Sequence, residues 1–61
     1  MTTGQQVTIR SGSYKTHGTV TRIDTVLHIA WVQTSLPYEK VFDSDTGQEI
    51  GGVGQLQEVG E

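Results

Sequence analysis

The chain has 61 residues and no cysteine, which excludes disulfides and thiolate zinc sites as a means of stabilising so small a core. Its net charge of −3 disfavours binding that depends on neutralising phosphates, and no segment approaches the roughly 20 apolar residues of a membrane span. We therefore expect one folded domain over residues 5–61, preceded by a flexible segment at residues 1–4, in the cytoplasm and with no membrane partner.

The charge is unevenly distributed along the chain. Residues 1–31 have a net charge of +2, whereas residues 32–61 have a net charge of −5. The charged residues of the first half are Arg10, Lys15, Arg22 and Asp24. Any binding to an acidic partner should therefore involve the first half, and any binding to a basic surface the second half.

The side-chain pattern of the first third of the chain is typical of strands. Residues 5–10 alternate, with Val7 and Ile9 on one face. The polar stretch at residues 11–18 is predicted to be an exposed loop. In the strand that follows, the alternation slips by one residue near Arg22, which predicts a β-bulge or a strong bend.

A third strand is predicted at residues 26–32, where both faces are substantially apolar. One face has Leu27, Ile29 and Trp31, and the other has Val26, His28, Ala30 and Val32. Either this strand lies centrally beneath a covering loop, or its second face meets a partner. Among the aromatic residues of the chain, we expect Trp31 and Phe42 to lie in the core.

The second half of the chain is predicted to contain a hairpin and a closing strand. A strand at residues 38–43 is followed by a type I turn at residues 44–47, whose glycine takes a positive φ, and by a return arm at residues 48–50. Apolar residues at a spacing of three then predict a short 3₁₀ turn before the last strand: Val53, Leu56 and Val59.

Five short strands, with a long loop after the first and a short turn before the last, resemble an SH3-like barrel. The N-terminal half, about residues 4–32, resembles the KOW motif of SH3-like barrels in transcription elongation factors and ribosomal proteins. The resemblance rests on alternating apolar residues around two glycines, namely Val7, Ile9, Gly12, Gly18, Val20 and Ile23. It implies an all-β fold, a small five-stranded SH3-like barrel, and a role in binding RNA or DNA.

The residues that suggest catalysis or metal binding have simpler explanations. Asp45-Thr46-Gly47 matches the catalytic triplet of aspartic proteases, but it lies in a predicted turn and the chain is too short for the paired loops of those enzymes. An EF-hand loop counted from Asp43 would have glutamine at its glycine position. His17 and His28 have no recognisable partner spacing. We predict no catalytic residue, metal site or cofactor, so an enzyme would require oligomeric assembly.

The leading hypothesis from the sequence is a non-enzymatic module that binds a protein partner and also self-associates. The residues predicted to contact the partner are Tyr14, Val26, His28, Val32 and Tyr38. Two observations motivate the hypothesis: the third strand is apolar on both faces, and the acidic second half would complement a basic surface.

The alternative hypothesis is a KOW-type nucleic-acid-binding module. Its predicted contacts come from the basic half of the chain: Arg10, Lys15, His17 and Arg22, with Tyr14 stacking on a base. The net charge of the whole chain counts against it.

Overall fold

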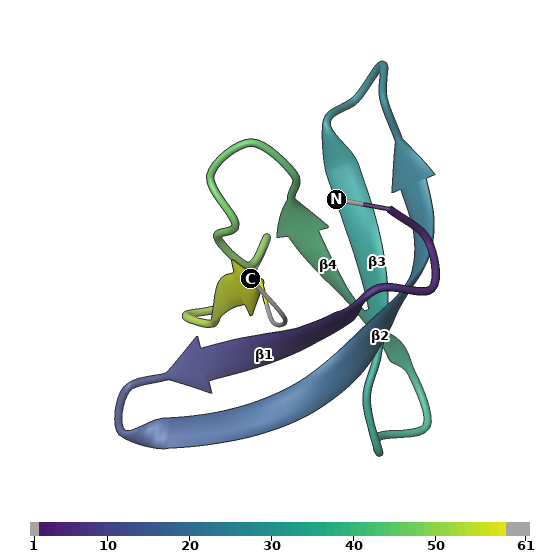
Figure 1. Ribbon diagram of the computed structural model, residues 1–61. Helices are drawn as coiled ribbons and strands as arrows, with labels where there is room; N and C mark the ends of the chain where they lie inside the picture. The colour runs from purple at the N-terminus through teal and green to yellow at the C-terminus, as the bar shows by residue number, and fades with distance from the viewer. Residues whose placement is uncertain (1, 59–61) are drawn as a thin grey trace.

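The computed structural model describes residues 2–58, which form one curled sheet of five antiparallel strands (Figure 1). The strands are β1 (Gln6–Ser11), β2 (Tyr14–Asp24), β3 (Ile29–Gln33), β4 (Glu39–Asp43) and β5 (Gln55–Glu58). Their order across the sheet is β4-β3-β2-β1-β5. The predicted all-β fold of five strands is therefore confirmed. The predicted 3₁₀ turn is not seen at residues 53–56, and Val59 lies outside the described residues.

Strands β1 and β2 form a long hairpin, so the prediction of an exposed loop over residues 11–18 is wrong. Ser11 pairs with Tyr14, and the turn between them consists of Gly12 and Ser13 alone. Gly12 has a φ of 63°, a conformation that glycine adopts without a steric penalty. The polar residues that suggested a loop belong to strand segments whose side chains are largely exposed.

The predicted bulge near Arg22 is confirmed. The pairing between β2 and β3 shifts between Val20 and Arg22, so that Thr21 is the extra residue. Val20 is buried and Ile23 packs against the same core, although three positions separate them. The bulge therefore lets both residues face inward while the strand bends.

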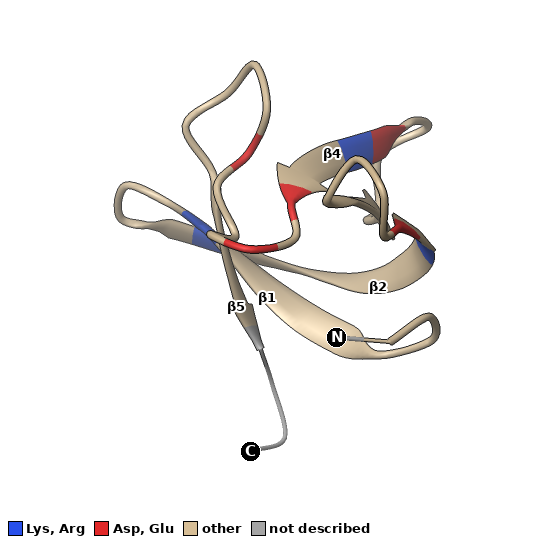
Figure 2. Cartoon of the chain, turned by 90° about the horizontal axis from the view of Figure 1, so that it is seen from above, with Lys and Arg blue, Asp and Glu red and all other residues tan. Residues whose placement is uncertain are grey.

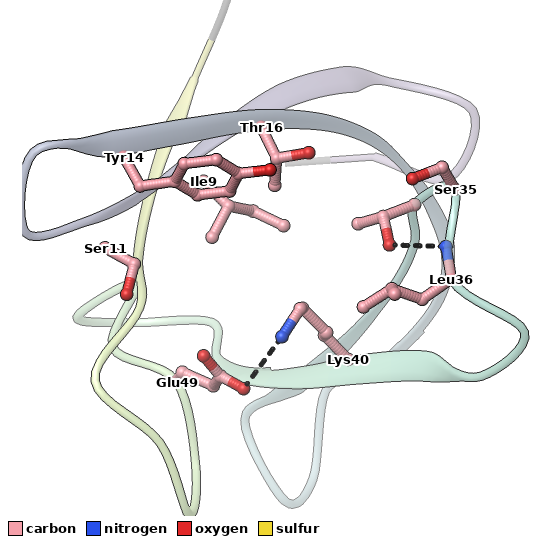
Figure 3. Close-up of a pocket in the computed structure, with 9 residues that line it drawn as sticks. Ile9, Ser11, Tyr14, Thr16, Ser35, Leu36, Lys40 and Glu49 are labelled. Carbon is pink, nitrogen blue, oxygen red and sulfur yellow. Dashed lines mark hydrogen bonds and ion pairs between the residues drawn. The ribbon is translucent and has the colours of Figure 1, made fainter.

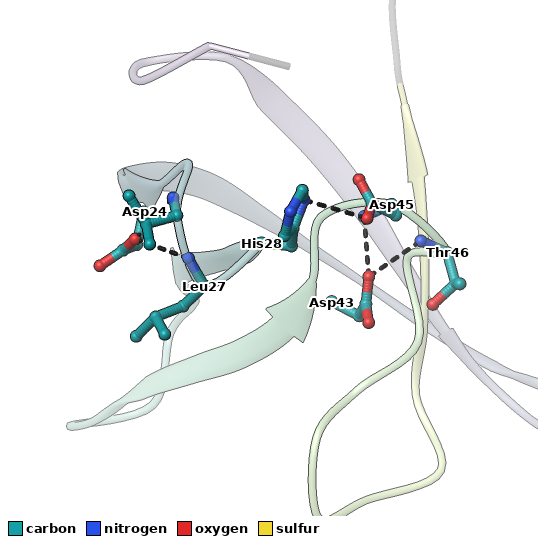
Figure 4. Close-up of polar contacts among 7 residues, drawn as sticks. Asp24, Leu27, His28, Asp43, Asp45 and Thr46 are labelled. Atoms are coloured by element: carbon teal, nitrogen blue, oxygen red, sulfur yellow. Dashed lines mark hydrogen bonds and ion pairs between the residues drawn. The ribbon is translucent and has the colours of Figure 1, made fainter.

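Strand β3 begins three residues later than predicted, because residues 25–28 form a turn. The Asp24 carboxylate accepts the backbone N–H groups of Val26 and Leu27, each at 2.9 Å (Figure 4). Such local bonds compete with strand pairing. His28 then takes a φ of 57°, which a non-glycine residue adopts only rarely.

The loop after β4 repeats this arrangement. Its first residue is Asp43, not Ser44 as predicted: the Asp43 carboxylate accepts the N–H groups of Asp45 (2.8 Å) and Thr46 (3.1 Å). Four residues after Asp43, Gly47 has the predicted positive φ, at 79°. The two loops touch each other, since His28 Nδ1 lies 3.0 Å from Asp45 Oδ2 (Figure 4).

Residues 47–50 join the two edges of the sheet. On one side, the Asp43 N–H donates to the Gln48 carbonyl and the Ile50 N–H donates to the Val41 carbonyl, each at 2.9 Å. On the other side, the Leu56 N–H donates to the Gly47 carbonyl at 2.6 Å. The predicted return arm is thus present, and it closes one end of the half-barrel over the core.

The core lies on the concave side of the sheet. It consists of Val7, Ile9, Val20, Val32, Phe42 and Leu56. The prediction for Phe42 is confirmed, whereas that for Trp31 is wrong. Ala30, which precedes Trp31 on β3, is buried, so the indole faces the convex side, where the guanidinium of Arg22 lies 3.9 Å from its ring centroid.

We expect Gly47→Ala to lower the free energy of unfolding by about 1–2 kcal/mol more than His28→Ala does. An alanine at residue 47 would have to adopt a positive φ, and its Cβ would lie 3.0 Å from the Leu56 carbonyl oxygen. His28 occupies the equivalent position of the other loop and is not a glycine, so its replacement removes only an exposed contact with Asp45. Urea unfolding of the two variants measures the difference, and equal losses would contradict it.

Candidate ligand pocket

A cavity of about 280 Å³ opens on the concave side, where the β1–β2 hairpin faces the β3–β4 loop and β4 (Figure 3). Its lining combines apolar side chains, hydroxyl groups and one pair of opposite charges. The lining residues are Ile9, Ser11, Tyr14, Thr16, Thr34, Ser35, Leu36, Lys40 and Glu49.

Strand alternation places these side chains on the inner surface. On β4, Lys40 is two residues before the core residue Phe42, so both point to the concave side. On the hairpin, Ile9 is directly opposite Thr16, and the next inward pair is Ser11 with Tyr14. The inner surface therefore changes from apolar in the core to polar at the open end.

Lys40 and Glu49 form an ion pair in the wall of the pocket. The Lys40 Nζ lies 3.5 Å from Glu49 Oε2, and the two side chains are only 21% and 18% exposed. Burying two charges costs desolvation free energy that their mutual attraction only partly offsets. Replacing one of the two residues would leave the other charge largely buried and unpaired. We therefore expect the loss of either side chain to destabilise this wall of the pocket.

The loop at residues 51–54 fixes the Glu49 carboxylate. The Gly54 N–H donates to Glu49 Oε1 at 3.1 Å, and the Glu49 N–H donates to the Gly54 carbonyl at 2.8 Å. A Cβ at Gly52 would lie 2.6 Å from Glu49 Cδ, and one at Gly54 would lie 2.5 Å from Oε1. Glycine at these two positions is what lets the carboxylate sit against the loop.

Four hydroxyl groups around the pocket are free to bind a ligand. Within residues 2–57, these four groups make no hydrogen bond to another protein group. The hydroxyl of Thr34 differs, because its Oγ1 accepts the Leu36 N–H at 3.2 Å. The four groups belong to Ser11, Tyr14, Thr16 and Ser35. The pocket thus offers donors and acceptors next to the apolar surface of its wall.

The predicted partner-binding residues do not form one surface. Val32 is 0% exposed, so its prediction as a contact residue is wrong: β3 lies between β2 and β4, and this side of the strand faces the core. Val26 (84% exposed) and His28 lie in the β2–β3 loop. Tyr38 is exposed just before β4, outside the pocket lining, whereas Tyr14 lines the pocket.

Three of the predicted nucleic-acid-binding residues come together on the convex side of the hairpin. Arg10 is directly opposite Lys15, and His17 is opposite Thr8, with 3.4 Å between His17 Nδ1 and Thr8 Oγ1. Basic positions are visible near the tip of the hairpin in Figure 2. Arg10, Lys15 and His17 therefore share one face.

The other two predicted nucleic-acid contacts lie elsewhere. Tyr14 lines the concave pocket, on the opposite side of the hairpin from Lys15. Arg22 stacks on Trp31, beyond the bulge of β2. Tyr14 and the basic residues Arg10 and Lys15 therefore lie on opposite faces of the hairpin.

Sequence reasoning missed the central pair of the pocket, Lys40 and Glu49. They fall in the predicted strand at residues 38–43 and the predicted return arm at residues 48–50, to which no binding role is assigned. Two signals were present in the sequence. Lys40 is in phase with the inward-facing Phe42, and the glycine cluster at residues 51–54 indicates a close approach of another group to the backbone.

Comparison with protein-family models, curated proteins and solved structures found no match for this chain. The resemblance to SH3-like barrels and to the KOW motif stays a prediction. In the part of the chain that the structure describes, no group of three or more His, Asp or Glu side chains is placed to hold a metal ion. Nor do residues 2–58 contain a helix with the length and apolarity to cross a membrane.

We expect Gly54→Ala to lower the free energy of unfolding by about 1–3 kcal/mol, because its Cβ would overlap Glu49 Oε1 and lie 3.2 Å from Ile9 Cγ2. Glu49→Ala removes the overlapping atoms, so Gly54→Ala should cost clearly less in that background. A double-mutant cycle by urea unfolding measures the coupling. Strictly additive losses would show that the carboxylate does not occupy the space beside Gly54.

Proposed function

We propose that this protein is a small non-enzymatic module of SH3-like type that binds an extended segment of a protein partner in the concave pocket. The observation that supports this function is the cavity itself. It joins the apolar surface of Ile9, Tyr14 and Leu36 to the polar pair formed by Lys40 and Glu49. Ligand sites in proteins typically combine an apolar lining with a few placed polar groups.

The size of the cavity favours a peptide over a large cofactor. Small-molecule sites usually enclose roughly 300–1,000 Å³. At about 280 Å³, this cavity is near the lower limit, so it suits a small part of a longer ligand better than a whole large cofactor. The ligand would then extend out of the open end of the half-barrel, as a segment of a longer chain does.

Tyr14 is well placed to contact such a segment. It lines the pocket while remaining 69% exposed, so the ring sits at the rim and is accessible from solvent (Figure 3). Tyrosine is enriched in binding hot spots because it presents a large, rigid surface with a polar tip. Leu36 extends the apolar rim from the β3–β4 loop.

A displayed library of random 12-residue peptides, selected against the intact chain, tests the proposal. Selected peptides should bind Tyr14→Ala and Leu36→Ala about tenfold or more weakly, the loss expected for an interface anchor. Lys15→Ala is the matched control, because Lys15 is next to Tyr14 in sequence but on the convex face. Its affinity should stay within about twofold of the wild type.

Two results would contradict the proposal. One is a selection from which no peptide emerges with measurable affinity for the wild-type chain. The other is a set of peptides that bind the Tyr14 and Leu36 variants as well as they bind the wild type. Circular dichroism of each variant shows whether the fold is retained.

A second candidate function, nucleic-acid binding, is supported by the convex face of strands β5, β1 and β2. Among residues 6–10 of β1, 15–19 of β2 and 55–57 of β5, the outward positions of this face include no carboxylate, despite the acidic net charge of the chain. They are Gln6, Thr8, Arg10, Lys15, His17, Thr19, Gln55 and Gln57. Such a face would contact phosphates through Arg10 and Lys15.

If this face binds nucleic acid, Arg10→Ala/Lys15→Ala should reduce the slope of log affinity against log salt concentration by about 2, one for each phosphate that the variant no longer neutralises. Fluorescence anisotropy with single-stranded RNA and duplex DNA, from about 50 to 200 mM salt, measures the slope. Arg22→Ala is the control, since Arg22 stacks on Trp31 beyond the bulge. Absence of binding by the wild type at the lowest salt would rule out this function.

A further inference from the structure

We infer that the pocket selects an uncharged peptide segment, in which the backbone N–H and carbonyl of one residue bridge Glu49 and Lys40 while its apolar side chain packs against Tyr14 and Leu36. This inference rests on the proposed function and specifies its ligand. It follows from three properties of the pocket: the fixed pair of opposite charges, their unused hydrogen-bonding capacity and the apolar rim.

The two charges of the pocket wall are not equally mobile. Glu49 is held by the Gly54 N–H and by the contact of its carboxylate with the backbone of the glycine loop. Lys40 reaches Glu49 from β4 through a flexible side chain, and the 3.5 Å separation of Nζ and Oε2 is long for a direct hydrogen bond. A ligand therefore meets a fixed carboxylate and an ammonium that can adjust its position.

Both charged groups have hydrogen-bonding capacity to spare. An ammonium has three N–H donors and a carboxylate has about four acceptor sites. Within residues 2–57, the contacts of these charged atoms are one between Lys40 and Glu49 and one from the Gly54 N–H to Glu49. In an extended peptide, the N–H donor and the carbonyl acceptor of one residue point to the same side of the backbone, so the N–H suits Glu49 and the carbonyl suits Lys40.

A charged ligand group gains much less from this arrangement. An anion attracted by Lys40 lies within reach of the Glu49 carboxylate, and a cation attracted by Glu49 lies close to the Lys40 ammonium. In each case the attraction is offset by repulsion from the partner a few ångströms away. The cost of removing the charge from water is then left uncompensated.

The apolar part of the lining defines the side chain of the bound residue. Ile9 forms part of the wall, Leu36 projects from the β3–β4 loop and the Tyr14 ring lies on the hairpin side (Figure 3). An aliphatic side chain fits between these groups while its own backbone reaches the Lys40–Glu49 pair. Leucine is a suitable model residue because it fills part of a 280 Å³ cavity without crowding the polar pair.

Three leucine derivatives that differ in charge test this inference. N-acetyl-leucine N-methylamide is uncharged, N-acetyl-leucine is an anion and leucine N-methylamide is a cation at neutral pH. Each is titrated into the ¹⁵N-labelled full chain, and the amide resonances of the pocket residues are followed. The uncharged compound should shift these resonances at millimolar concentration. Both ions should bind with an affinity lower by about tenfold or more.

Two variants that each remove one charge change the preferred ligand in opposite directions. Glu49→Gln keeps an oxygen that accepts the Gly54 N–H but leaves Lys40 unopposed, so the anion should become the best ligand. Lys40→Gln leaves Glu49 unopposed, so the cation should become the best ligand. Dispersed amide spectra show which variant is folded, and either one alone is sufficient for the comparison.

The outcomes separate this inference from the proposed function. Equal affinities for the three compounds, or an unchanged order in a folded variant, would show that the charge pair does not select the ligand. Absence of pocket shifts with all three compounds, when library peptides still require Tyr14, would overturn the ligand class but keep the peptide-binding function. If the three compounds bind in the predicted order but the library yields no binding peptide, the ligand class would be supported and the protein-partner function contradicted.

Discussion

The segment at residues 47–50 is hydrogen-bonded to both edges of the sheet, and the rest of the structure depends on this closure. A sheet of this size has two edges with unpaired backbone groups and a concave surface that must be shielded from water. Hydrogen bonds to Asp43 and Val41 on β4, and to Leu56 on β5, satisfy part of these groups. The same segment covers the end of the half-barrel where Phe42 and Leu56 pack.

The closure also builds the pocket, because Glu49 belongs to the closing segment. Its backbone pairs with β4 and with Gly54, and its side chain turns back toward Lys40. The glycines at residues 52 and 54 are needed for this geometry, since a Cβ at either would occupy the space of the carboxylate. Stability and the proposed ligand recognition therefore depend on the same few interactions in this part of the chain.

The two surfaces of the β1–β2 hairpin have different chemistry. Tyr14 faces the concave pocket, and Lys15, the next residue, faces the convex side opposite Arg10. Because side chains alternate along a strand, neighbouring residues contribute to separate surfaces. The two proposed binding functions can thus be tested independently on one hairpin, with variants at adjacent positions serving as controls for each other.

The sequence by itself determined the all-β fold, the strand at Val7 and Ile9, the bulge near Arg22 and the positive φ of Gly47, because these features depend on alternation and local backbone preferences. It did not determine which side of β3 is buried. Both faces of that strand are apolar, so the burial of Val32 was decided by its position between β2 and β4. The pocket was likewise decided by tertiary structure. Its charge pair joins a regular strand to an irregular segment, and the position of that segment depends on hydrogen bonds to residues distant in sequence rather than on any repeating pattern.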